Sequence, residues 1–175
     1  DRFSALAEPA WKDRFSSGDP LASGTTFTAL GAWEAAYGWE WVQNVHANGW
    51  IAAGGNSAVM ARMESGERPI GIVLLENLLA KPGVASVTWP VDGAVAIPGM
   101  VAIPADCPAP EAAERVVDWL LGDAAQTEIV AGHMHSPFPE SPAPAGIPPL
   151  SAIHTFPEPP DVDPAALKAR WEGLR

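Results

Sequence analysis

The stretch from Asp19 to Thr26 (DPLASGTT) brings together residues that could bind a small anion. Pro20 has no backbone donor and holds the residue before it in an extended conformation, so a strand is expected to end there. Ser23 is a favourable N-cap, and the amides after it lie at the positive end of a helix without intrahelical partners. The amide and hydroxyl donors would come from Ser23, Gly24, Thr25 and Thr26. The pattern predicts a seat for a small oxyanion, and a capped helix with nothing bound is the structural alternative.

Strand and helix patterns alternate along the first half of the chain. Extended patterns cover residues 14–18, 51–53, 69–75 and 84–89. One helical pattern runs from about Ser23 to Tyr37, and others cover residues 39–47, 57–64 and 77–80. The run 69–75 is nearly all apolar, as in a strand that is buried on both faces. This alternation predicts an α/β fold built from layers.

The pattern changes after residue 94. Residues 94–103 are apolar and extended, and helices are expected over residues 111–121 and 124–131. Spacing predicts that the first of these helices turns Ala113, Val116, Val117 and Leu120 inward. Proline dominates residues 136–164, and Pro164 suits the first position of a last helix that ends near Leu174.

Length and charge limit the functions that this chain can have. Its 175 residues are enough for one full core, or for one core and part of another. The formal net charge of −11 argues against nucleic acid or an anionic membrane as a partner, although local donors can still bind a small anion. Cys107 is the only cysteine, which excludes an intrachain disulfide. The start at Asp1 shows neither a signal peptide nor an initiator Met, so we expect a processed or cut chain.

Several segments, taken in order, resemble one protein family. They are DPLASGTT from Asp19, GGNSAV from Gly54, SGE from Ser65, GIV from Gly71, PVDG from Pro90, PEAAE from Pro110, VDWLL from Val117, and Gln126. From about Leu6 to about Pro137 the chain resembles a type II periplasmic solute-binding protein of an ABC importer. The most similar branch is the one usually labelled for ferric iron, phosphonates or sugar phosphates. Such receptors close two α/β lobes on a solute, and the resemblance covers only the second lobe and the return into the first.

The resemblance implies an arrangement for the whole chain. Residues 1–95 would be the second lobe, a three-layer α/β sandwich. Residues 96–135 would be a crossover strand and the helices that return to the first lobe, and residues 136–175 a proline-rich tail with a C-terminal helix. The chain would then be a fragment of a longer protein, and the surface left open by the missing lobe would favour self-association.

The resemblance also implies a function, that of the substrate-binding component of an ABC import system. The partners would be a small anionic solute and a membrane permease. The protein itself would be periplasmic, or secreted and tethered to the membrane. No nucleic acid, cofactor, metal or enzymatic activity is expected. Helix N-termini and loops hold the solute in this family, and the matching positions are Ser23, Gly24, Thr25, Thr26, Gly55, Asn56, Ser57 and Glu76. For the second turn, made by Gly55, Asn56 and Ser57, the alternative is an unrelated helix cap. For Glu76 it is a solvated loop carboxylate that binds nothing.

Other functions have weaker support in the sequence. Iron-binding members of the branch place adjacent tyrosines in the cleft, whereas Tyr37 is the only tyrosine here, which argues against iron bound by tyrosinate. His133 and His135 are two residues apart and match no compact metal site. No Ser-His-Asp or Cys-His pairing is readable. An enzyme acting on a phosphate ester is disfavoured because no acid-base pair can be assigned. The main alternative is the ligand-sensing effector domain of a transcription regulator with the same fold.

Overall fold

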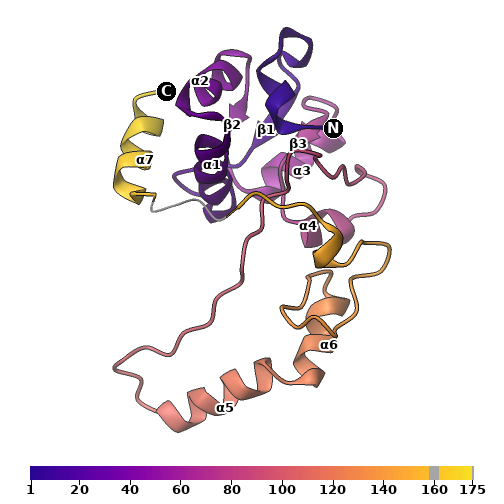
Figure 1. The fold of residues 1–175 in the computed structure, drawn as a ribbon, viewed down its shortest axis with the longest axis vertical. Coiled ribbons are helices and arrows are strands. Elements are labelled where there is room, and N and C mark those ends of the chain that lie inside the picture. The colour runs from indigo at the N-terminus through magenta and orange to yellow at the C-terminus, as the bar shows by residue number, and fades with distance from the viewer. Residues whose placement is uncertain (158–161, 175) are drawn as a thin grey trace. The chain divides into compact units, whose positions relative to one another are not determined.

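The computed structural model describes residues 1–157 and 162–174, and the chain divides into two compact units. Residues 1–97 and 154–175 form the first, which we call the sheet unit (Figure 1). Residues 98–153 form the second, the helical unit. Among the described residues, no helix is both long and apolar enough to cross a membrane.

The described part of the sheet unit contains one parallel sheet, with its strands in the order β2-β1-β3. Ser16 in the central strand pairs with Ile51 on one side and with Gly71 on the other. All of β1 is buried, as its central place requires. The strand bounds are Phe15–Ser17 for β1, Ile51–Ala52 for β2 and Ile70–Gly71 for β3.

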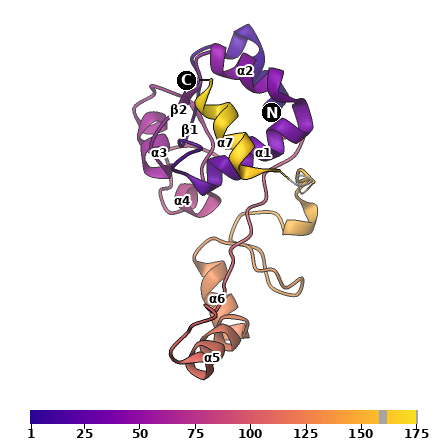
Figure 2. The same ribbon diagram turned by 90° about the vertical axis from the view of Figure 1, so that its left-hand side faces the viewer.

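Helices cover both faces of this sheet, which confirms the predicted three-layer α/β sandwich (Figures 1 and 2). One face carries α1 (Gly24–Tyr37), α2 (Trp39–Ala47) and α7 (Pro164–Glu172). The other face carries α3 (Asn56–Glu64). The chain moves from β1 to β2 on one side and then crosses back to β3, so right-handed crossovers place α1 and α3 on opposite faces.

Local sequence signals determine both ends of α1. The Ser23 hydroxyl oxygen accepts a hydrogen bond from the Thr26 amide at 3.3 Å, which makes Ser23 the N-cap that the sequence predicts. At the other end Gly38 has a φ of 80°, which glycine adopts without steric cost. The Gly38 amide donates to the Glu34 carbonyl oxygen at 2.8 Å, and α2 begins at the next residue.

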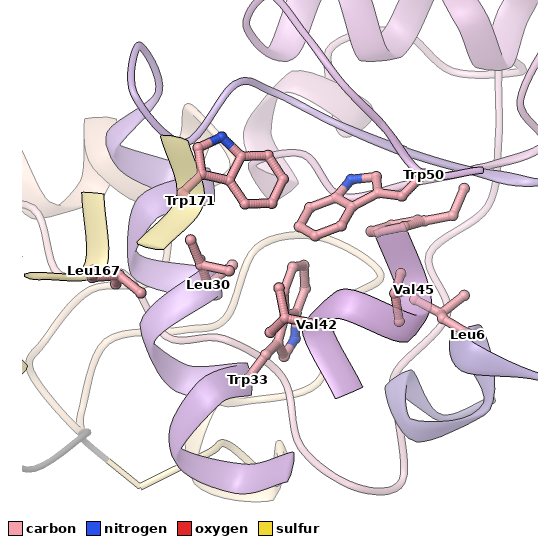
Figure 3. Close-up of a cluster of buried hydrophobic side chains, with 10 residues drawn as sticks. Leu6, Leu30, Trp33, Val42, Val45, Trp50, Leu167 and Trp171 are labelled. Atoms are coloured by element: carbon pink, nitrogen blue, oxygen red, sulfur yellow. The ribbon is translucent and has the colours of Figure 1, made fainter. Parts of the chain in front are cut away.

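Aromatic side chains form the core between the sheet and the helices α1, α2 and α7 (Figure 3). The ring centroids of Trp33 and Trp50 are 5.8 Å apart, and those of Trp50 and Trp171 are 5.0 Å apart. The Trp50 indole nitrogen also donates to the Ser17 hydroxyl oxygen at 2.9 Å, so both polar groups are satisfied inside the core. Large buried aromatic rings, together with the leucines and valines of the same cluster, supply apolar contact that the short strands do not.

The C-terminal helix α7 belongs to this core. Leu167 and Trp171 are 2% and 1% exposed and face α1, and Arg170 forms an ion pair with Glu34 of α1 (Figure 3). The sequence predicted a last helix that begins at Pro164, and α7 lies within the sheet unit.

The helical unit contains α5 (Pro110–Leu120) and α6 (Asp123–Ala131), close to their predicted bounds. The prediction that α5 turns its apolar face inward is wrong for Val116, which is 56% exposed beside Trp119 at 58%. The physical reason is that the described residues of this unit bury only small or polar groups, which give α5 little to pack against. These buried residues are Ala125, Gln126, Ser136 and Pro144.

Two predicted extended segments form no strand. Residues 84–89 have no ladder partner, and within residues 94–103 only Ala94 forms a bridge, to Thr155. A further strand would have to add to β2 or β3, and each of these edge strands is only two residues long. The two units meet at residues 97/98 and 153/154. The division into a lobe (1–95), a return segment (96–135) and a tail (136–175) stays a prediction.

The carboxylate of Asp92 connects three segments of the sheet unit. Its Oδ1 accepts from the Phe3 amide at 3.0 Å, and its Oδ2 accepts from the Ser4 amide at 2.9 Å and the Tyr37 hydroxyl at 2.8 Å. Burial alone would raise the pKa of Asp92, but hydrogen bonds from Ser4, Tyr37 and Phe3 outweigh it and lower this pKa below its ordinary value of 3.8. Burial and the hydrogen bond to Asp92 raise the pKa of Tyr37, so the phenol stays a proton donor.

The packing of α7 gives a first prediction. Replacing Trp171 with alanine should lower the free energy of unfolding by about 3–5 kcal/mol, because a large buried ring is removed from the core. Urea unfolding followed by circular dichroism measures the change. The neighbouring exposed residue supplies the control, since Glu172→Ala should leave the midpoint nearly unchanged. Equal midpoints for the two variants would show that α7 is not part of the cooperative core.

The Asp92 carboxylate gives a second prediction. Asp92→Asn should lower thermal stability at neutral pH by about 1–3 kcal/mol, because charge-assisted hydrogen bonds are lost. The pKa of Asp92 is lowered on folding, so its contribution is present above the unfolded value of 3.8 and is lost as the pH falls through the lower folded value. The difference in Tm between the wild-type chain and the variant should therefore narrow below pH 3.8. A difference that stays constant across this range would contradict the prediction.

Candidate functional site

Each strand of the sheet leads into a helix at the same edge. β1 is followed by α1, β2 by α3, and β3 by the short helix α4 (Leu75–Leu79). Because the strands are parallel, their carboxyl ends share one edge, where open α/β sheets bind their ligands. The predicted binding residues all lie at these helix starts: Ser23, Gly24, Thr25 and Thr26 at α1, Gly55, Asn56 and Ser57 at α3, and Glu76 in α4.

The first turn, residues 19–26, leads from β1 into α1. It is closed by the backbone of Asp19, whose carbonyl oxygen accepts from the Ser23 amide at 2.7 Å. The Ser23 hydroxyl oxygen accepts from both the amide and the hydroxyl of Thr26, each at 3.3 Å, and Thr26 is only 1% exposed. The Thr26 amide is therefore used inside the turn, contrary to the expectation that it lacks a partner. The amides of Gly24 and Thr25 are the ones left without an acceptor in their own helix.

The second turn begins α3 without a side-chain cap. Its N-cap is Gly55, which has no side chain to accept a hydrogen bond, so the amides of Asn56 and Ser57 keep their donors. Gly55 and Ser57 are exposed and Asn56 is half-buried. Gly54 has a φ of 71°, and a Cβ built on it would lie 2.7 Å from the Cβ of Ala58, so this turn requires glycine.

A hydrogen bond joins the two turns. The Asp19 amide donates to the Gly54 carbonyl oxygen at 2.8 Å, directly beyond the last ladder contact between β1 and β2. Gly18 lies at the meeting point, where an added Cβ would be 2.9 Å from the Thr26 Oγ1 and 3.0 Å from the Gly54 carbonyl oxygen. The structure thus brings the helix starts of α1 and α3 to neighbouring places.

Glu76 lies at the start of a different helix. It belongs to the first turn of α4, which follows β3 on the other side of β1 from β2, and it is half-buried. α4 packs beside α3, but no hydrogen bond among the described residues joins Glu76 to either turn. The structure therefore places Glu76 at the same sheet edge without linking it to the other predicted residues.

Sequence reasoning missed two residues that shape this edge. Arg62 of α3 donates from both terminal guanidinium nitrogens to the Ala53 carbonyl oxygen, each at 3.1 Å, which puts a cation beside the second turn. Its position eight residues after Gly54 carries no signal that would have identified it. Gly18 could have been found, since a glycine at the end of a predicted strand often marks a close backbone approach.

Tyr37 and His135 have contacts of their own. Tyr37 is the last residue of α1, at the opposite end from Ser23, and its hydroxyl donates to Asp92. His135 Nε2 lies 2.9 Å from the Pro148 carbonyl oxygen in the helical unit. Among the described residues, no group of three or more His, Cys, Asp or Glu side chains is arranged to hold a metal ion.

Comparison with known proteins identifies a matching family and similar folds. The family model described as bacterial extracellular solute-binding protein matches residues 1–157. The crystal structure of iron-bound HitA from Pseudomonas aeruginosa is similar, with 20% identity, a TM-score of 0.67, and coverage of 99% of this chain and 59% of that chain. A structure described as "Two-component system protein mediate signal transduction" has 17% identity, a TM-score of 0.71, and coverage of 97% and 60%. A search of curated proteins finds no match.

These likenesses concern the fold. The identities of 20% and 17% are too low to carry a ligand across, so each comparison shows only that the backbone is arranged in the same way. The chain spans 59% and 60% of the lengths of those two solved chains.

The contact between the two turns gives a third prediction. Gly18→Ala should lower the free energy of unfolding by about 1–3 kcal/mol, because the new Cβ meets Thr26 and the backbone of Gly54. Gly24→Ala is the matched control, since a Cβ there has nothing within 4 Å. The control should be neutral or stabilising by up to about 1 kcal/mol. Thermal unfolding compares the two, and equal losses of stability would contradict the close approach at Gly18.

Proposed function

The chain belongs to the bacterial extracellular solute-binding proteins, and from this we propose that it forms part of the solute site of an ABC import system. The proposed ligand is a small oxyanion-bearing solute, held between two lobes by helix N-termini. On this proposal the chain is a binding protein and not an enzyme, and it acts outside the cytoplasmic membrane, in the periplasm or tethered to the membrane surface.

One observation carries the choice of ligand. The starts of α1 and α3 are joined through the hydrogen bond from the Asp19 amide to the Gly54 carbonyl oxygen. Each start offers backbone amides at the positive end of a helix, which is the arrangement that binds phosphate-like groups elsewhere in proteins. Two such ends beside one another favour a ligand with several oxygen atoms, because one oxyanion can accept from both.

The residues would have different roles at this site. The amides of Gly24, Thr25, Asn56 and Ser57 would donate to the oxyanion, with Gly55 leaving room for its approach. Ser23 and the buried Thr26 would hold the first turn in shape through their mutual hydrogen bonds. Glu76 would accept from a hydroxyl or ammonium group elsewhere on the solute.

Iron is the alternative ligand raised by the similarity to iron-bound HitA. A tyrosinate site is not supported here, because Tyr37 lies at the far end of α1 and donates its hydroxyl to Asp92. Burial and that hydrogen bond raise the pKa of Tyr37, which disfavours the phenolate that would bind Fe(III). The oxyanion proposal uses backbone amides and does not need this side chain.

The proposed partners follow from the family. A membrane permease would receive the solute, and nucleic acid would have no part. Self-association of the chain is also part of this proposal. A sensing role is the second candidate, because a protein described as mediating signal transduction in a two-component system has the same fold. The transcription-regulator version of that role rests on the sequence resemblance alone.

Amide chemical shifts of the 175-residue chain give a fourth prediction. Titration with methylphosphonate or inorganic phosphate at millimolar concentrations should move the resonances of Gly24, Thr25, Asn56 and Ser57 together, because the amides that bind the anion change most. Choline, a cation of similar size, should leave them unchanged. Shifts caused by choline and not by either anion would reject the ligand class.

Removing a single donor sharpens this test. Thr25→Pro deletes one amide in the first turn of α1, where proline is tolerated, and should abolish the phosphonate-induced shifts at both turns. Ala124→Pro is the matched control, because it makes the same change at the second residue of α6. If Thr25→Pro binds methylphosphonate as well as the control does, the amides of α1 are not the binding group.

A further inference from the structure

Three segments that are far apart in sequence form one hydrogen-bonded junction in the sheet unit. We define the junction as residues 1–4, 91–94 and 154–156. The Val91 amide donates to the Asp1 carbonyl oxygen at 2.9 Å. The Ala94 amide donates to the His154 carbonyl oxygen at 2.8 Å, and the Phe156 amide donates back to the Ala94 carbonyl oxygen at 2.9 Å. The junction is therefore made of both backbone and side-chain hydrogen bonds between short segments.

Gly93 allows these segments to pass close to one another. It is buried and has a φ of 127°, which disfavours any residue with a side chain. A Cβ built on Gly93 would lie 2.9 Å from the Phe156 backbone nitrogen. The sequence motif PVDG, which begins at Pro90, thus has a structural role that is separate from the candidate solute site.

Both chain connections to the helical unit begin at this junction. One leaves after Ile97, three residues beyond Ala94, and the other returns immediately before His154. Because Ala94 and Thr155 are bridged, the two connections leave the sheet unit from adjacent points. A contact that fixes the junction therefore also fixes the points at which both connections leave the sheet unit.

Asp92 is the side chain that fastens the junction to a helix. Its carboxylate binds the amides of Phe3 and Ser4 within the junction, and the Tyr37 hydroxyl at the C-terminal end of α1. The Tyr37 ring also lies 5.8 Å from the Phe156 ring, edge to face. Hydrogen bonds to an ionised acceptor are stronger than those between neutral groups, so this contact outweighs the neutral contacts around it.

From these contacts we infer that Asp92 is a positioning residue that locks both inter-unit connections to helix α1. The lock acts at one end of α1, and the candidate solute site lies at the other end, about 20 Å away for a helix of this length. A single rigid helix is thus common to both. The inference concerns the junction only, so it holds whichever solute the protein binds, and its test needs no ligand.

Hydrogen exchange measured by mass spectrometry tests the lock. In Asp92→Asn and in Tyr37→Phe, the amides of Ala94 and Phe156 should exchange at least about tenfold faster than in the wild-type chain, because the contacts that hold the junction closed are weakened. The Ala53 amide, which donates to the Ser17 carbonyl oxygen at 3.1 Å in the sheet, should be accelerated by a clearly smaller factor, because a general loss of stability reaches every amide whereas the local loss reaches the junction alone. Tyr37→Phe retains the ring and so keeps the test available if Asp92→Asn does not fold.

Asn48→Ala is the matched control. The Asn48 side-chain nitrogen donates to the carbonyl oxygens of Leu6 at 2.9 Å and Glu8 at 2.8 Å, so it holds the same N-terminal segment at a point outside the junction. This variant should change the rates of junction and sheet amides in parallel or leave both unchanged. If Asp92→Asn and Tyr37→Phe also change junction and sheet amides by the same factor, Asp92 stabilises the whole unit and is not a lock. Unchanged rates at Ala94 and Phe156 in both variants would equally overturn the inference.

Discussion

The parallel pairing of β1 with both of its neighbours is the constraint on which the sheet unit depends. Parallel strands all end at one edge, so the helices that follow them must begin there. Strands of two or three residues add few ladder bonds of their own, and the turns beyond them come within hydrogen-bonding distance. The contact between Asp19 and Gly54 follows from this geometry, and it explains why Gly18 has no room for a side chain. The candidate site is therefore a consequence of how the sheet is connected.

Such a short ladder cannot hold this edge together by itself, and the aromatic core supplies the missing stability. Trp50 contacts Trp33 from α1 and Trp171 from α7, so the start and the end of the chain close over the same face of the sheet. α1 receives contacts along its whole length, from the Ser23 cap to the hydrogen bond between Tyr37 and Asp92. The helix that offers amides at one end is thus fixed at the other, which keeps those amides in a constant direction. Preorganised donors of this kind bind an anion with little reorganisation.

The sequence predicted the elements that have strong local signals. The Ser23 cap identified the start of α1, and proline at the first position identified α7. It failed where tertiary contacts decide. Residues 84–89 have the composition of a strand but no ladder partner among the described residues, and Val116 of α5 is left exposed although its spacing is apolar. Thr26 turned inward because Ser23 accepts from both its amide and its hydroxyl. A sequence pattern does not show which of these donors is used inside the turn. The hydrogen bonds of the Asp92 carboxylate join segments that are too far apart in sequence for local patterns to predict the contact.

A protein with a formal net charge of −11 would be an unexpected host for the proposed anion, but the geometry of the edge supplies local donors. Surface carboxylates act through water and salt, and their field is largely screened beyond a Debye length of about 8–10 Å. Backbone amides at a helix start act at hydrogen-bonding distance, where no water or ion intervenes. The Arg62 guanidinium, held on the Ala53 carbonyl oxygen, adds a positive charge beside one of the two turns. The diffuse negative charge would then slow the approach of an anion without preventing its binding, and Glu76 would favour solutes that also carry a donor group over simple inorganic anions.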